Sequence, residues 1–232
     1  MGTANNEFRL ALKGIADQFY GQLRFKPVMK HFATGDVSRV EYVTFLRQSY
    51  HYVQATTPNL NAAAASVRQS SSSHRDDISA RFLEHAADEQ GHDEWILDDL
   101  EALGEDRAAV HDFQPCTAVR AYLAYSHHLA RSRHAVALFG QAYVLEGGAL
   151  ESSDYMVRGL IEHSGIPNIA DGVKYLRLHG EVDIEHVQAL GRALDWVTEP
   201  EDQYAVRLAA EFTSQVILDL VDYVETVSVA RV

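Results

Sequence analysis

Apolar residues recur at helical spacing along most of the chain, whereas the strict alternation typical of a half-buried strand is scarce. Alanine, leucine, glutamate, glutamine and arginine, which favour helices, are abundant. The pattern predicts helices over residues 5–23, 38–67, 74–103, 116–130, 133–164, 168–197 and 200–228. Long neighbouring helices joined by short loops form bundles, and no composition shift or long linker divides them. We therefore expect an all-α, seven-helix bundle in which residues 1–232 form a single domain.

Residues that break or restart helices separate the predicted elements. The serines at 70–73 end the second helix, and Gly104 ends the third. Pro58 lies inside the second helix and should kink or interrupt it, because proline lacks a backbone donor. Residues 106–115 are expected to form a surface connection, and residues 164–167 a helix stop and restart.

Composition narrows the classes of function. The 232 residues carry a formal net charge of −13, which argues against a nucleic-acid partner because such a protein needs a basic face. No uninterrupted apolar stretch approaches the ~18 residues of a membrane span, and the N-terminus carries no recognisable signal sequence. The single cysteine, Cys116, excludes an intramolecular disulfide and a cysteine-based zinc site. We expect a cytoplasmic protein with no membrane partner.

Four of the twelve histidines recur in two matched segments of the form His-x3-acid-x2-His. The first contains His85, Glu89 and His92, and the second contains His179, Asp183 and His186. On a continuous helix such positions fall within about 60° of one another, so each segment presents two imidazoles and a carboxylate in one direction. If the two helices face each other, six nitrogen or oxygen ligands meet in the interior of the bundle.

A single copy of this pattern is more often a hydrogen-bonded helix face than a metal ligand set. The duplicated spacing favours a metal site, because a repeated three-residue pattern is rare by chance. Glu146 is a further candidate, since a carboxylate among apolar and small residues is costly unless it is paired or metal-bound, although it could also lie at a helix surface. The adjacent Gly147 and Gly148 would let a substrate, a cofactor or a neighbouring helix approach closely.

The ligand types indicate which metal is expected. Thiolates are missing from the candidates, which disfavours structural zinc, copper(I) and iron–sulfur clusters. Four imidazoles with two or three carboxylates suit iron(II) or manganese, as one ion or a pair, and zinc stays possible.

At this point the sequence resembles the heme-oxygenase-like diiron oxidases and oxygenases, and in particular their iron-containing redox enzyme branch. The resemblance is carried by the segment from Glu84 to Trp95, by Glu146 and by the His-x3-Asp-x2-His segment from His179 to His186. It implies the seven-helix fold shared by heme oxygenase, TenA thiaminases and the pyrroloquinoline quinone synthase PqqC. It also implies a non-heme iron site, a homodimer, and activation of dioxygen to oxidise a small organic substrate.

The resemblance assigns metal-ligand roles to His92, Glu146, His179, Asp183 and His186. The first carboxylate of the family pattern is expected seven residues before His92, where this chain has His85. Glu89 can supply the missing oxygen ligand, so we expect one bound iron, or two with the second more weakly bound.

Two other classes of function stay open. The chain could be a metal-free enzyme or ligand-binding protein of the TenA or PqqC kind, in which the same histidines act as acid–base groups or line a pocket. It could also be a structural helical protein whose histidine faces only pack, which the duplicated spacing disfavours.

Overall fold

The computed structural model describes residues 3–229, and this part of the chain consists of helices and loops. The all-α prediction is confirmed. The α-helices are α1 (Thr3–Leu23), α2 (Pro27–Thr34), α3 (Arg39–Val53), α4 (Thr56–Val67), α5 (Arg75–Asp88), α6 (His92–Ala102), α7 (Arg107–Asp112), α8 (Thr117–Ala130), α9 (Leu138–His163), α10 (Lys174–Ala193) and α11 (Pro200–Val229). Three short 3₁₀ turns are η1 (Ala135–Ala137), η2 (Ile169–Asp171) and η3 (Leu194–Trp196). None of the described helices is long and apolar enough to cross a membrane.

The expected count of seven continuous helices is not confirmed, because two long predicted helices are interrupted. The second divides into α3 and α4 just before Pro58, which lies in the first turn of α4, where a missing N–H costs little. The third divides into α5 and α6 at Gly91, which has a left-handed φ of 89°.

Two short helices lie outside the predicted helices. Helix α2 starts at Pro27 and ends before Gly35, whose φ of 78° suits a helix C-cap. The proline at its start and the glycine at its end are usual helix boundary signals, and they could have predicted this helix. Helix α7 lies within the expected surface connection, and the Asp106 side chain caps it by accepting from the Ala108 N–H.

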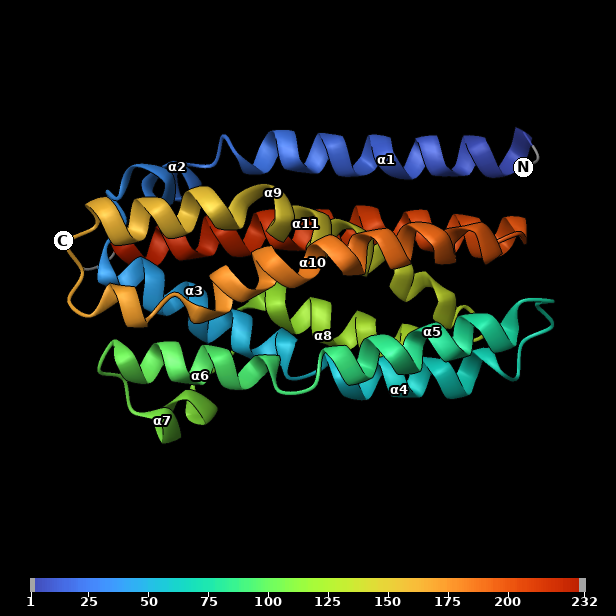
Figure 1. The fold of residues 1–232 in the computed structure, drawn as a ribbon, viewed down its shortest axis with the longest axis horizontal. Helices are drawn as coiled ribbons and strands as arrows, with labels where there is room; N and C mark the ends of the chain where they lie inside the picture. The colour runs from blue at the N-terminus through green and yellow to red at the C-terminus, as the bar shows by residue number, and fades with distance from the viewer. Residues whose placement is uncertain (1–2, 230–232) are drawn as a thin grey trace.

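Helices α9, α10 and α11 run along the middle of the molecule (Figure 1). In that view α1 lies on one side of them, and α4, α5 and α6 lie on the other (Figure 1). Helix α9 packs against α10, α11, α2 and α1, which places its residues at the centre of the bundle. Large side chains from several helices fill the core, including Tyr42, Phe32, Phe82 and Phe139.

Two glycines on α9 allow its neighbours to come into backbone contact. A Cβ at Gly140 would overlap the carbonyl oxygen of Val206 on α11. A Cβ at Gly159 would overlap the carbonyl oxygen of Phe32 on α2. The positions of α11 and α2 against α9 therefore depend on residues without side chains.

The start of α10 is held by a side chain from another helix. Asp99 on α6 is fully buried and accepts from the backbone N–H groups of Lys174 at 2.7 Å and Tyr175 at 2.8 Å. These are two of the four N–H groups that a helix start leaves without intrahelical partners. Asp99 therefore acts as an N-cap supplied from a distant part of the sequence.

We expect Gly140→Ala to lower the free energy of unfolding by about 1–3 kcal/mol, because the added methyl group forces α9 and α11 apart. Gly14→Ala is the matched control, since Gly14 is exposed in α1 and a Cβ there meets nothing within 4 Å. The control should be stabilised by roughly 0.5–1 kcal/mol from helix propensity. Urea denaturation measures both variants, and equal effects would contradict the close approach.

We expect the stability difference between wild type and Asp99→Asn to depend on pH. Burial raises the pKa of Asp99 from 3.8 to about 7. Between the ordinary pKa of 3.8 and the folded pKa of about 7, the folded chain binds the Asp99 proton more tightly than the unfolded chain. The stability that this proton contributes therefore falls as pH rises through that range and levels off above the folded pKa.

Urea denaturation of both proteins from pH 5 to 8 measures this difference. Asp98→Asn is the control, because the neighbouring Lys174 lowers the pKa of Asp98 and its titration lies below this range. A wild-type advantage over Asp99→Asn that stays constant or grows with pH would contradict the raised pKa.

Candidate metal centre

All seven residues expected to bind metal lie close to one another in the described structure. Six of them are buried, and His179 is partly exposed. They come from the end of α5 and the turn after it, from the start of α6, from α9 and from α10. These residues are His85, Glu89, His92, Glu146, His179, Asp183 and His186.

The first matched segment is not one continuous helix face, contrary to the expectation. Helix α5 ends at Asp88, Gly91 adopts a left-handed conformation, and His92 is the first residue of α6. Non-glycine residues reach this conformation at a cost of roughly 1–2 kcal/mol, so a glycine suits the turn. The turn directs Glu89 and His92 toward the same interior space as His85.

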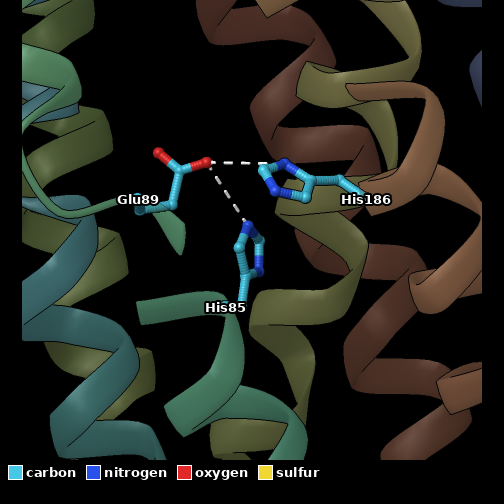
Figure 2. Close-up of side chains that lie close together, drawn as sticks. All are labelled: His85, Glu89 and His186. Atoms are coloured by element: carbon cyan, nitrogen blue, oxygen red, sulfur yellow. Dashed lines mark ion pairs between the residues drawn. The ribbon is translucent and has the colours of Figure 1, made fainter. Parts of the chain in front are cut away.

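One group of possible ligand atoms consists of His85, Glu89 and His186 (Figure 2). The Oε1 atom of Glu89 lies 3.5 Å from His85 Nε2 and 3.7 Å from His186 Nδ1. Figure 2 shows this oxygen directed toward both imidazole rings. The group joins α5 to α10, so the two matched segments do face each other.

A second group consists of Glu89, His92 and His179, whose ligand atoms lie within 4.8 Å of one another. The Oε2 atom of Glu89 is 3.2 Å from His92 Nδ1, and the rings of His92 and His179 have centroids 4.9 Å apart. Glu89 belongs to both groups and presents a different oxygen to each. If metal ions occupied both groups, Glu89 would contribute an oxygen to each.

The remaining two carboxylates extend the first group. Glu146 Oε1 lies 3.1 Å from His85 Nε2, and Asp183 Oδ1 lies 3.4 Å from His186 Nδ1. Glu146 is therefore an interior residue and not part of a helix surface.

Several ligand atoms of the cluster are buried and make no hydrogen bond among the described residues, although the three imidazole nitrogens concerned lie within ion-pair distance of carboxylate oxygens. They are His85 Nε2, His92 Nδ1, Glu146 Oε2, both Asp183 carboxylate oxygens and His186 Nδ1. Each buried, unsatisfied polar atom costs about 1–3 kcal/mol, and more when it is charged. Nitrogen and oxygen atoms that converge in this way fit a divalent metal, whose binding would satisfy them.

Burial and mutual attraction shift the pKa values within the cluster. Burial raises the pKa of Asp183 to about 6 and lowers that of His179 to about 4. For His85, burial opposes protonation, but Glu146 and Glu89 outweigh it and raise the pKa to about 10. Burial likewise opposes ionisation of Glu89, but His85 and His92 hold its pKa below the ordinary value. A metal ion would take the place of the protons bound by this cluster.

Two contacts around the cluster were not anticipated from the sequence. The Nδ1–H of His179 donates to the carbonyl oxygen of Tyr175 at 3.2 Å, which leaves Nε2 as the nitrogen available to a metal. Trp95 stacks on His92 with ring centroids 3.9 Å apart. The i to i−4 spacing could have indicated the first contact and the His-x2-Trp spacing the second.

The two glycines after Glu146 accommodate a neighbouring helix. A Cβ at Gly147 would overlap the hydroxyl of Tyr20 on α1, which donates to the Tyr143 carbonyl at 3.1 Å. Gly148 lines a cavity of about 180 Å³ that reaches the cluster at Glu89 and Glu146. Gly147 therefore allows the close approach of a neighbouring helix, and the adjacent Gly148 faces a space that could hold a small molecule.

The helical architecture and the buried histidine–carboxylate cluster define a heme-oxygenase-like protein with a candidate metal centre. Residues 43–216 match the family model described as iron-containing redox enzyme, and the chain belongs to this family. The family resemblance is thus confirmed. No curated protein matches the sequence.

Solved structures support the same fold. A domain of unknown function with a heme oxygenase-like fold from Shewanella denitrificans OS217 is 18% identical, with a TM-score of 0.81 over 97% of this chain and 93% of that one. A TenA homologue from Pseudomonas syringae pv. tomato DC3000 is 12% identical, with a TM-score of 0.81 over 94% and 93%. A TenA homologue from Pyrococcus furiosus is 15% identical, with a TM-score of 0.74 over 94% and 99%. At these identities the likeness establishes the fold alone.

Proposed function

We propose that this protein is a non-heme iron oxidoreductase that activates dioxygen to oxidise a small organic substrate. The observation that carries the proposal is the convergence of four imidazoles and three carboxylates, several with buried and unsatisfied ligand atoms, at the edge of an apolar cavity. Membership of the iron-containing redox enzyme family supports iron as the metal. The proposal includes the homodimer implied by the family resemblance.

The geometry supports a division of the ligands between two ion positions. His85 and His186 would hold one ion, and His92 and His179 the other, with Glu89 between them. Glu146 and Asp183 lie beside the first position and would complete it. Three ionised carboxylates would offset most of the charge of two divalent ions. The energetic cost of burying the two ions would therefore be reduced.

The ligand chemistry favours iron over softer metals. Imidazole and carboxylate ligands without thiolate are typical of iron and manganese sites in helical bundles. When bound, ferrous iron supplies the electron-transfer chemistry that activation of dioxygen requires. Manganese would suit the same ligands.

The protein's own residues would orient the centre and keep it dry. The Tyr175 carbonyl fixes the tautomer of His179, and Asp99 anchors the helix that carries three of the ligands. The apolar lining of the cavity would exclude water from the cluster and hold the substrate beside it.

A metal-free enzyme is the alternative, and the fold similarity to TenA homologues favours considering it. In that case His85 or Asp183, whose pKa values burial and neighbouring charges shift, would act as acid–base groups beside the cavity. Measurement of bound metal separates the two proposals.

We expect Glu89→Ala to reduce iron binding at both positions, because Glu89 belongs to both ligand groups. His186→Ala removes a ligand from one group only and should lower the iron content by up to one ion per chain. Each substitution should lower the affinity for iron by roughly tenfold or more. Elemental analysis measures the iron content of both variants after anaerobic reconstitution with ferrous ion and removal of unbound iron.

His163→Ala is the control, since His163 lies exposed at the end of α9 and contacts Glu162. Its iron content should equal that of wild type. If wild type holds no iron, or if Glu89→Ala and His186→Ala leave the iron content unchanged, the proposed metal centre is wrong.

We expect wild-type protein reconstituted with ferrous iron to consume dioxygen, and His92→Ala to consume it more slowly under the same conditions. His92 is a ligand candidate for the second position, so its loss should weaken iron binding there. An oxygen electrode measures the rate, with His163→Ala again as the control. Iron bound at wild-type stoichiometry without oxygen consumption would overturn the oxidase activity while leaving the metal centre in place.

A further inference from the structure

The cavity beside the cluster has a defined size. Its volume is about 180 Å³, and it is bounded on one side by ligand candidates, among them Glu89, Glu146 and His179. An apolar protein cavity of about 150 Å³ accepts benzene. The space therefore suits a molecule of about one substituted aromatic ring.

The rest of the lining is largely apolar and rich in aromatic rings, including Phe19, Phe45 and Tyr122. Most hydroxyl and amide groups in the wall already have partners within the protein. Ser126 Oγ donates to Gln141 Oε1 at 2.9 Å, and Ser152 Oγ donates to the Gly148 carbonyl at 2.7 Å. These groups offer little new hydrogen bonding to a bound molecule.

Apart from the ligand candidates His85, Glu146 and Asp183, Ser153 is the residue of the described wall whose buried side-chain polar atom has no hydrogen-bond partner. Its side chain is 2% exposed, it lines the cavity, and its Oγ has no hydrogen-bond partner among the residues described. It lies seven residues after Glu146 on α9, hence on the same helix face. A Cβ at Gly180 would approach Ser153 Cβ to 3.0 Å, which places this serine against the part of α10 next to His179.

In the absence of bound metal, the charge around the cavity disfavours an anionic ligand. Among the described residues that line it, the charged groups are carboxylates and imidazoles, and lysine and arginine do not occur. Arg131 reaches Asn59 of the lining but is itself exposed. A second hollow shares Leu23, Gly148 and Ser152 with the cavity. Its wall contains both Arg24 and Glu151, so it favours neither an anionic nor a cationic ligand.

We propose that the cavity binds an uncharged, mostly apolar molecule of about one substituted ring, whose hydroxyl, amino or carbonyl group hydrogen-bonds to Ser153 Oγ. The proposal rests on the proposed function, because it names the substrate class of that site. The hydrogen bond would place the polar end of the molecule against α9 and α10, next to the ligand residues.

Fluorine NMR titration of the chelator-treated, full-length protein tests this binding. The probes are 4-fluorophenol, fluorobenzene and 4-fluorobenzoate, with octanoate as an unlabelled competitor. We expect 4-fluorophenol to bind about fivefold more tightly than fluorobenzene, the size of one neutral hydrogen bond. 4-Fluorobenzoate and octanoate should bind at least tenfold more weakly than 4-fluorophenol, since His85 already pairs with Glu89 and Glu146 and a buried carboxylate would find no free cationic partner.

Ser153→Ala should abolish the preference for 4-fluorophenol and leave fluorobenzene binding intact. Ser152→Ala is the matched control and should keep the preference, because its hydroxyl already bonds the Gly148 carbonyl. Ala149→Leu should weaken both probes by filling the cavity, with thermal denaturation confirming that the variant is folded.

The proposal is overturned if neither neutral probe binds, if either carboxylate binds as tightly as 4-fluorophenol, or if Ser153→Ala keeps the preference. Because these titrations use metal-free protein, they are independent of the iron measurements. Binding of 4-fluorophenol without any iron binding would contradict the proposed function alone, and iron binding without probe binding would contradict the cavity assignment alone.

Discussion

The burial of three carboxylates and four imidazoles in one interior space is the constraint on which this structure depends. Polar atoms at such depth are unfavourable unless they are paired, and several here lack hydrogen-bond partners among the described residues. Their mutual attraction offsets part of this penalty, as the raised pKa of His85 and the lowered pKa of Glu89 indicate. A bound divalent metal would offset the remainder, so the centre and the fold around it are expected to be stabilised together.

The rest of the bundle holds the two sides of this cluster in place. Asp99 of α6 caps α10, so the helix that carries His179, Asp183 and His186 is anchored by a residue next to the other ligand segment. Gly140 of α9 lets α11 approach closely, and α9 in turn carries Glu146 to His85. Each candidate ligand thus depends on contacts between helices, because most helical stability in proteins comes from tertiary packing.

The cluster and the cavity have complementary roles. The cluster gathers the ionisable groups, while the adjoining wall is largely aromatic and aliphatic and includes the buried Ser153 hydroxyl, which has no partner among the described residues. A redox-active metal at the proposed centre would lie beside a small apolar space, which suits a mostly apolar molecule. Trp95, stacked on His92, extends the aromatic surroundings to the outer side of the second ligand group.

The sequence by itself determined the helical class and most helix positions, because helical spacing decides which side chains share a face. Its motifs also carried the family resemblance and the candidate ligands. It did not determine that the first ligand segment is broken at Gly91, nor that Glu89 faces both ligand groups. It also left open whether Glu146 is buried and which residues line the cavity.

Those features depend on contacts between residues far apart in the chain, such as Glu146 with His85 and Asp99 with the start of α10. Only tertiary packing decides such contacts, because local spacing carries no information about which helix lies opposite.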